Sequence, residues 1–226
     1  ALSKLKKVSQ LDPDHPVKKY IDSRQIPSNL HYKLFYAPKF GAWVNSMIPN
    51  KIKVGEKDEP RLIIPFLDEE KNLFGFQGRS FRKDGVRYIT IMLDETKPKV
   101  FGLDTIDESK DIYLLEGPID SMFLPNAMAA AGGDLSAQIE QTGLLKEKIV
   151  VVFDNEPRHS DTIKRMQKAI DAGYRVVIWP SDIQYKDVND MILSGMKSEY
   201  IKDVLDECNY SGPTAKLHFA LWRKDR

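Results

Sequence analysis

Three clusters of acidic residues occur in the second half of this 226-residue chain, and each follows a short apolar run. They are Glu116 with Asp120, Asp154-Asn155-Glu156, and Asp187-Val188-Asn189-Asp190. Such runs are typical of buried strands, and the carboxyl ends of parallel strands meet at one edge of a sheet. Carboxylates that converge there repel one another unless a cation lies between them. Because Mg²⁺ prefers oxygen ligands, the pattern predicts a magnesium site, with Mn²⁺ as an alternative ion.

Each acidic residue, taken alone, also has a structural interpretation. Acidic residues after strands often cap helices, and Asp187 or Asp190 would suit the helix that follows them. Asp120 is the weakest candidate, since it can simply begin the first helix. Three clusters within one half of the chain nevertheless favour a metal site.

The second half must therefore bring three strand ends together, and its pattern alternates between strand and helix. Strands are expected at 112–115, 127–131, 149–153 and 175–179, and helices at 119–124, 135–142, 161–172 and 188–193. Strands separated by helices predict a parallel sheet covered by helices. The predicted fold class is α/β for this half.

The first half has a different pattern. Strand-like runs at 61–67, 73–78 and 86–92 are separated by polar turns at 68–72 and 82–85. This order predicts an antiparallel meander. Prolines interrupt the preceding sixty residues, which look helical and irregular. We therefore expect a small α+β subdomain before the parallel sheet.

Charge divides the chain in the same way, although its net charge is only +1. Residues 1–105 carry 19 basic and 13 acidic residues, whereas residues 106–200 carry 10 basic and 16 acidic ones. A surface for phosphates next to a cation site fits this division. The predicted domains are a basic subdomain at 1–105, the parallel-sheet domain at 106–199, and a short helical or flexible tail at 200–226.

Composition excludes several other classes of protein. The single cysteine, Cys208, excludes a disulfide framework and a cysteine-based zinc finger, and it fits a reducing compartment. No apolar run approaches the roughly 18 residues that a membrane span needs. We expect a cytoplasmic protein with no membrane partner and no zinc.

Three ordered motifs resemble those of the Toprim domain, which primases share with topoisomerases and some nucleases. They are Leu115-Glu116-Gly117-Pro118-Ile119-Asp120, Val152-Phe153-Asp154-Asn155-Glu156 and Lys186-Asp187-Val188-Asn189-Asp190. The upstream segments Arg61–Phe66, Gly75–Arg79, Arg87–Ile89 and Lys99–Gly102 resemble the basic subdomain of DnaG-type primases. The runs at 154–165 and 186–192 are most similar to the T-even bacteriophage members of that family. If a phage encodes the chain, the resemblance implies that the protein acts in the cytoplasm of the host cell.

The resemblance implies roles for particular residues. Asp154, Glu156 and Asp187 would bind metal, with Asn189 and Asp190 as helpers, and Glu116 would transfer a proton or add a metal contact. Arg61, Arg79, Arg87 and Lys99 would bind nucleotide or template. Arg158 and Lys164 would contact the triphosphate or, equally well, pair with Asp161 or the acidic rim. Two departures are notable, because the second motif usually ends in Asp rather than Glu156, and many relatives have Asp in place of Asn189.

The implied function is that of a DNA primase core, which makes RNA primers on single-stranded DNA from ribonucleoside triphosphates. A hexameric replicative helicase is the implied partner. The family's N-terminal zinc ribbon is missing from these residues. The alternatives are a Toprim nuclease or topoisomerase-like enzyme that cleaves strands, and a non-catalytic DNA-binding Toprim module.

Overall fold

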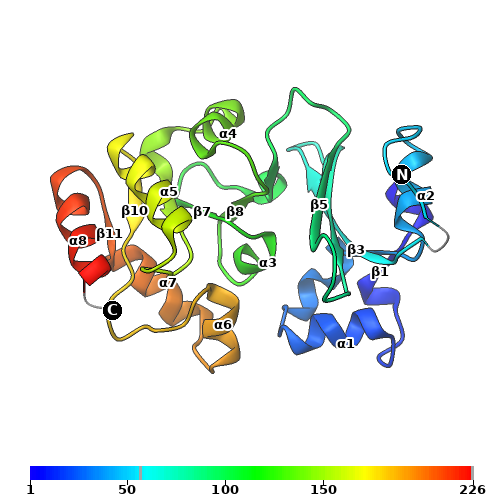
Figure 1. Ribbon diagram of the computed structural model, residues 1–226, viewed down its shortest axis with the longest axis horizontal. Coiled ribbons are helices and arrows are strands. Elements are labelled where there is room, and N and C mark those ends of the chain that lie inside the picture. The colour runs from blue at the N-terminus through cyan, green and yellow to red at the C-terminus, as the bar shows by residue number, and fades with distance from the viewer. Residues whose placement is uncertain (56–57, 225–226) are drawn as a thin grey trace. The chain divides into compact units, whose positions relative to one another are not determined.

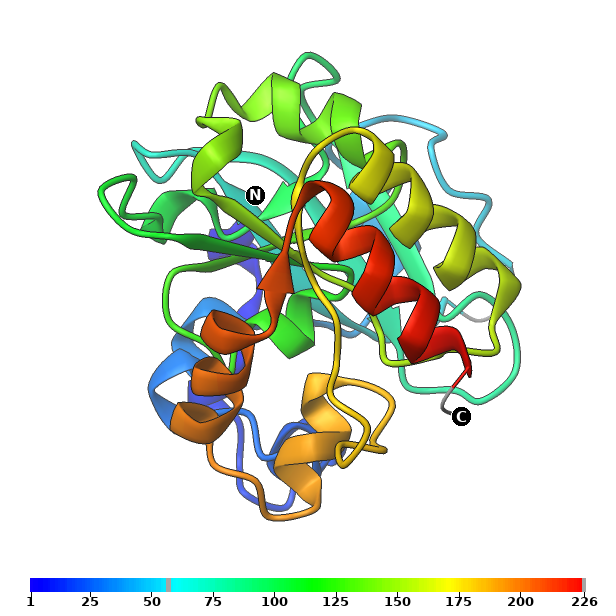
Figure 2. The ribbon, with the colours of Figure 1, turned by 90° about the vertical axis from the view of Figure 1, so that its left-hand side faces the viewer.

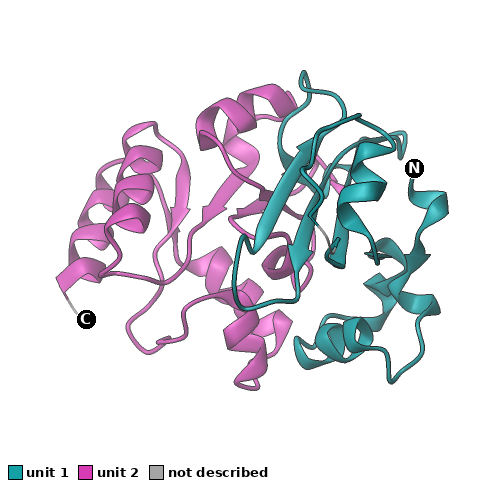
Figure 3. Cartoon of the chain, turned by 45° about the vertical axis from the view of Figure 1, so that its right-hand side comes forward, with its two compact units in different colours: residues 1–104 teal, residues 105–226 magenta. Residues whose placement is uncertain are grey.

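The computed structural model describes residues 1–55 and 58–224 of the chain (Figure 1). The chain forms two compact units, Ala1–Asp104 (unit 1) and Thr105–Arg226 (unit 2) (Figure 3). This division falls one residue before the end of the subdomain expected at 1–105. Residues 225 and 226, which end the predicted tail, lie outside the described residues.

Unit 1 contains short helices around a five-stranded antiparallel sheet with the order β1-β2-β3-β4-β5. Its strands are β1 (Lys6–Lys7), β2 (Phe35–Ala37), β3 (Arg61–Leu67), β4 (Leu73–Ser80) and β5 (Tyr88–Met92), followed by β6 (Val100–Phe101). Its α-helices are α1 (Pro16–Ser23) and α2 (Phe40–Asn45). The predicted meander is confirmed as β3-β4-β5, and β1 and β2 extend it by two strands that the sequence pattern did not reveal.

Pro65 lies within β3 although proline removes a hydrogen-bond donor from a sheet. Strand β2 pairs only with residues Arg61 to Ile63, so β3 forms the edge of the sheet at Pro65. On its other side, Pro65 faces Phe76 of β4. The edge position explains why the strand continues through a proline.

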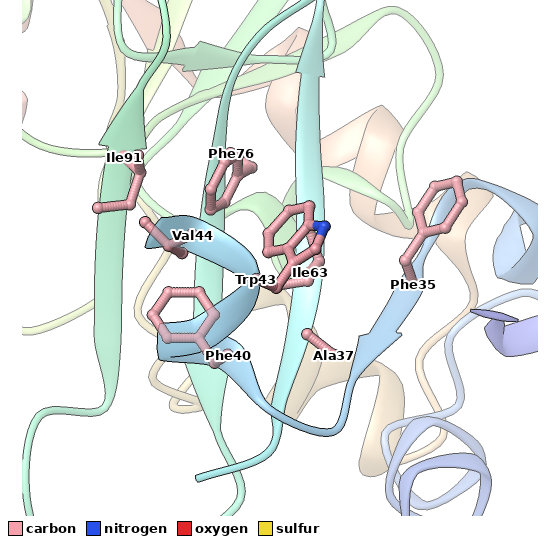
Figure 4. Close-up of a cluster of buried hydrophobic side chains, with 8 residues drawn as sticks. All are labelled: Phe35, Ala37, Phe40, Trp43, Val44, Ile63, Phe76 and Ile91. Atoms are coloured by element: carbon pink, nitrogen blue, oxygen red, sulfur yellow. The ribbon is translucent and has the colours of Figure 1, made fainter. Parts of the chain in front are cut away.

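The core of unit 1 lies between helix α2 and the sheet (Figure 4). Trp43 packs against Phe76 with ring centroids 4.7 Å apart, and Phe40 meets the same ring edge-on at 6.4 Å. At Gly78 of β4, an added Cβ atom would lie 2.5 Å from the Phe40 ring of helix α2. Glycine at this position therefore allows the helix to pack directly on the strand.

Unit 2 alternates strands and helices, as its sequence pattern predicts. Its strands are β7 (Ile112–Leu115), β8 (Ala127–Ala130), β9 (Ile149–Val152), β10 (Arg175–Val177) and β11 (Asn209–Tyr210). Its helices are α3 (Pro118–Ser121), α4 (Leu135–Thr142), α5 (Ser160–Asp171), α6 (Val188–Leu193), α7 (Ser198–Glu207) and α8 (Gly212–Lys224).

The strands of unit 2 lie in the order β11-β10-β9-β7-β8. Strands β7, β8, β9 and β10 are parallel, and every residue of β7 and β9 is buried, as expected for strands covered on both faces. Strand β11 is antiparallel to β10, so the sheet is mixed rather than wholly parallel. The predicted α/β fold, with a parallel sheet after an antiparallel meander, is confirmed.

Helices cover both faces of this sheet (Figure 2). Helices α5 and α8 lie side by side on one face. On the other face, the Tyr113 hydroxyl of β7 donates a hydrogen bond to Asp206 of α7. Residues 200–226, expected as a separate tail, thus contain most of α7 together with β11 and α8, and they are part of unit 2.

Among the residues that the structure describes, no helix combines the length and the apolar character needed to cross a bilayer.

Candidate active site

The first two acidic clusters meet at the carboxyl edge of the sheet in unit 2. Strands β7 and β9 are parallel neighbours in which Leu115 is paired with Val152, so Glu116 and Asp154 emerge at the same edge. The main-chain amide of Asp154 donates to Oε2 of Glu116 over 3.0 Å. This contact joins two residues that are 38 positions apart in the chain.

The third cluster is held against the second by main-chain contacts. Asp187 is the N-cap of α6, and its Oδ1 accepts a hydrogen bond from the amide of Asp190 over 2.8 Å. Immediately before it, the carbonyl oxygen of Lys186 accepts from the amide of Asn155 over 2.6 Å. Asp187 is therefore both a helix cap and a neighbour of Asp154.

Asp120 joins this group, although the sequence made it the weakest candidate. Its Oδ1 accepts a hydrogen bond over 2.8 Å from the amide of Asn189, at the start of α6. Burial raises the pKa of Asp120 to about 7, and the negative charges of Asp187 and Asp154 add to the effect. Asp120 thus lies inside the acidic cluster rather than at its edge.

Asp154 experiences the same excess of negative charge. Burial and then the charge of Asp187 raise the pKa of Asp154 to about 6, against the opposing charge of Lys186. Carboxylates whose pKa values rise in this way are held close together with incomplete compensation. The same set of oxygen donors is the kind that a hard cation prefers.

Two basic residues that the sequence analysis missed contact the acidic cluster. Arg165 of α5 forms an ion pair with Glu116, which bridges 49 positions of sequence. Lys186 lies 3.3 Å from Glu156 and 4.0 Å from Asp154. Lys186 is the first residue of the third motif, and this position was a usable signal. No comparable signal in the sequence pointed to a contact between Arg165 and Glu116.

The remaining members of the predicted metal set differ in exposure. Asn189 is buried, and Asp190 is partly buried. Within residues 1–55 and 58–224, no three His, Cys, Asp or Glu side chains are arranged as a ready-made metal site. The predicted nucleotide-binding residues Arg158 and Lys164 are both exposed. On helix α5 it is Arg165, one position after Lys164, that reaches the acidic cluster.

In unit 1, Arg61 has a structural environment that does not suit the predicted binding role. Only 2% of the residue is exposed, and its guanidinium donates to the carbonyl oxygens of Gly78 (3.0 Å) and Val86 (2.9 Å). It also pairs with Glu59 and lies over the Phe40 ring. Arg61 fixes the ends of three strands to one another, so its guanidinium is not presented to phosphates.

Replacement of Arg61 by alanine is therefore expected to destabilise the protein by about 3 kcal/mol, because it leaves a carboxylate and several carbonyl groups without their donor. Urea unfolding would measure the loss. The control is Arg82→Ala, because Arg82 is an exposed turn residue paired with Asp84, and its loss should matter little. A stable Arg61→Ala protein that has lost nucleotide affinity would restore the binding role.

Arg79, Arg87 and Lys99 are placed in three different ways. Arg79 is 7% exposed and lies between two tyrosine rings, with its guanidinium carbon 4.3 Å from the Tyr20 centroid and 5.6 Å from that of Tyr88. Its Nε also donates to the Tyr88 hydroxyl over 3.1 Å. Lys99 is partly buried, whereas Arg87 is exposed. Arg87 is thus the most accessible of the basic residues predicted in unit 1.

Comparisons with known proteins agree with this fold. No protein-family model matches the chain. A DNA primase domain from Pseudomonas aeruginosa has a TM-score of 0.69 at 15% identity, over 92% of this chain and 76% of that one. The zinc-binding and RNA polymerase domains of the Aquifex aeolicus primase have a TM-score of 0.66 at 20% identity, over 94% of this chain and 61% of that one.

The fold is accordingly that of the RNA polymerase domain of DnaG-type primases. The sequence adds a closer relationship. The DNA primase of Enterobacteria phage T4 is 39% identical over 221 residues, which are 96% of this chain and 63% of the phage protein. The chain is similar in sequence to that phage DNA primase and spans less than two thirds of its length.

Proposed function

We propose that the chain is the RNA polymerase core of a DNA primase, which makes short RNA primers on single-stranded DNA from ribonucleoside triphosphates. The observation that carries the proposal is the meeting of Glu116, Asp120, Asp154 and Asp187 at one sheet edge, in a chain similar in sequence to a phage DNA primase. Four carboxylates at one edge are costly to folding, and a catalytic cation gives a reason for keeping them.

The donor chemistry of the cluster fits Mg²⁺. Asp154, Glu156 and Asp187 would hold the ion through carboxylate oxygens, and Asp120 adds a fourth carboxylate to the same group. The pKa values of Asp120 and Asp154 are raised first by burial and then by the negative charge of Asp187, and a bound cation would offset both effects. The main-chain amide of Asn189 donates a hydrogen bond to Asp120, and that of Asp190 donates one to Asp187. We therefore assign Asn189 and Asp190 a supporting role.

In the proposed reaction, the 3′-hydroxyl oxygen of a primer or a first nucleotide attacks the α-phosphorus of an incoming triphosphate, and pyrophosphate leaves. When bound, Mg²⁺ would supply activation of the attacking oxygen and neutralisation of charge on the leaving group. Glu116 is the candidate to accept the hydroxyl proton. Its carboxylate is oriented at Oε1 by Arg165 and at Oε2 by the Asp154 amide.

The proposed nucleotide and template contacts are Arg87 and Lys99 in unit 1, with Arg158, Lys164 and Arg165 in unit 2. Arg79 is left out of this set, because it is only 7% exposed and its guanidinium lies over two tyrosine rings. An arginine guanidinium can hold two phosphate oxygens at once, whereas lysine offers a point charge. A hexameric replicative helicase is the proposed protein partner, on the strength of the family resemblance alone.

The deciding experiment is a magnesium-dependent assay with single-stranded DNA and labelled ribonucleotides. Short RNA products support the primase. Nicked DNA supports the alternative of a strand-cleaving Toprim enzyme, and DNA binding without either product supports a non-catalytic module.

Arg87→Ala is expected to weaken binding of single-stranded DNA and to lower the slope of log affinity against log salt by about 1, because one phosphate contact is lost. Fluorescence anisotropy at several salt concentrations would measure it. Lys83→Ala, in the exposed turn at 82–85, is the matched control and should leave the slope unchanged. An unaltered slope in the Arg87 variant would remove this residue from the DNA surface.

A further inference from the structure

Asn155 lies between the acidic residues Asp154 and Glu156, and the proposed chemistry gives it no role. Both of those carboxylates are partly exposed, but Asn155 is only 5% exposed. A buried amide side chain must find hydrogen-bond partners within the protein. The partners of Asn155 show what this residue does.

The donor groups of Asn155 all bond to the loop that leads from β10 to α6. Its side-chain Nδ2 donates to the carbonyl oxygen of Ile183 over 2.8 Å and to that of Tyr185 over 3.1 Å. Its main-chain amide donates to the carbonyl oxygen of Lys186 over 2.6 Å. These three acceptors lie within four residues of Asp187. One residue thus ties the loop that carries Asp154 and Glu156 to the loop that carries Asp187.

The acceptor group of Asn155 bonds to a third element. Its Oδ1 accepts a hydrogen bond over 3.0 Å from the indole Nε1 of Trp222, a buried residue of α8 that is 67 positions away. Indole nitrogen is only a donor, so this contact fixes which end of the amide points towards α8. A second indole supports the same loop, since Trp179 donates to the carbonyl oxygen of Phe153 over 2.9 Å.

The asparagine side chain satisfies each of the hydrogen-bonding groups that these contacts place around position 155. A carboxylate would set its oxygens against the carbonyl groups of Ile183 and Tyr185, and an aliphatic side chain would leave those carbonyls and the Trp222 indole unbonded. Each buried group left without a partner costs free energy. The selection of asparagine is therefore explained by geometry between the loops rather than by contact with a substrate.

We propose that Asn155 is a positioning residue, which sets the separation of Asp154 and Glu156 from Asp187 and anchors that arrangement to α8 through Trp222. The inference rests on the proposed function, because it takes these carboxylates to be the metal ligands. Groups that orient metal ligands from behind typically change metal affinity by about 10- to 100-fold when removed. Helix α8 is then part of the support of the metal site.

The test compares three variants of the chain. Asn155→Ala removes the whole side-chain clamp, and Trp222→Phe removes only the indole donor while keeping an aromatic ring in place. Asn209→Ala is the matched control, because Asn209 Nδ2 also donates to two carbonyl oxygens, those of Leu205 (2.8 Å) and Asp206 (3.0 Å) in α7, and it makes neither of these bonds to a loop that carries an acidic motif. Calorimetry would measure the affinity for Mn²⁺ and Mg²⁺, and urea unfolding in EDTA would measure metal-free stability.

We expect Asn155→Ala to weaken metal binding by about 10- to 100-fold. Trp222→Phe should act in the same direction by less, and Asn209→Ala should lower stability while metal affinity stays as in the unaltered chain. If Asn155→Ala does not fold, Trp222→Phe decides. Normal metal affinity in folded Asn155→Ala or Trp222→Phe protein would overturn the positioning role. Failure of the unaltered chain to bind either metal would instead overturn the proposed function.

Discussion

Replacement of Asp154 by asparagine is expected to abolish magnesium-dependent primer synthesis while leaving the fold intact. The loss should reach about 1,000-fold or more, beyond the 10- to 100-fold that removal of a supporting contact costs, because a direct metal ligand is lost. Primer yield on single-stranded DNA, followed with labelled ribonucleotides, would measure it. The main-chain amide that donates to Glu116 is unaffected by the substitution.

The same variant is expected to be at least as stable as the unaltered chain when metal is removed. The pKa of Asp154 is raised to about 6, so its ionised form is unfavourable in the folded protein at neutral pH. Asparagine removes that charge and keeps the size of the side chain. A variant that is destabilised, but whose folded fraction retains normal activity, would show that Asp154 is structural.

The strand-end carboxylates were predictable because parallel register alone brings Glu116 and Asp154 to one edge. Asp120 was underestimated for a different reason. Its importance depends on a contact with the amide of Asn189, which is 69 positions away, and no local pattern encodes that distance. The same limit hides the pairing of Arg165 with Glu116.

The basic residues of unit 1 show why type and spacing are insufficient on a sheet. Arg61 begins the strand beside the other predicted contacts, and the family resemblance implied that it binds nucleotide or template. In the structure, however, the carbonyl groups of Gly78 and Val86 surround its guanidinium and leave it buried. To predict this structural role, one must know where the neighbouring strands end. The sequence of one strand does not contain that information.

Asn155 is a third residue whose role the sequence did not reveal. Its neighbours Asp154 and Glu156 attracted the functional interpretation, and an asparagine between two acidic residues resembles a loop spacer. Its role emerges only when the loop before Asp187 and the C-terminal helix are in place around it. The expectation of a short helical or flexible tail at 200–226 gave no reason to place Trp222 against Asn155.

Metal-free protein is expected to become less stable as the pH rises from about 4 to about 7. Asp120 has a pKa of about 7 in the folded state, against an ordinary value of 3.8, so the folded protein binds this proton more tightly than the unfolded chain does. Stability therefore falls with rising pH in this window, by up to about 1.4 kcal/mol per pH unit for one group. Below pH 3.8, Asp120 is protonated in both the folded and the unfolded protein, so it no longer makes the stability depend on pH.

Asp120→Asn tests the origin of this effect, because asparagine removes the titrating group and retains an oxygen that can accept from the Asn189 amide. At pH 8 in EDTA, the variant should be more stable than the unaltered chain by up to about 4 kcal/mol, and the two should converge towards pH 4. Urea unfolding at pH 4, 5, 6, 7 and 8 would measure both profiles. Asp203→Asn, on the exposed side of α7, is the control and should leave the profile unchanged. If the Asp120 variant kept the pH dependence of the unaltered chain, the excess negative charge of the cluster would have to reside on other carboxylates.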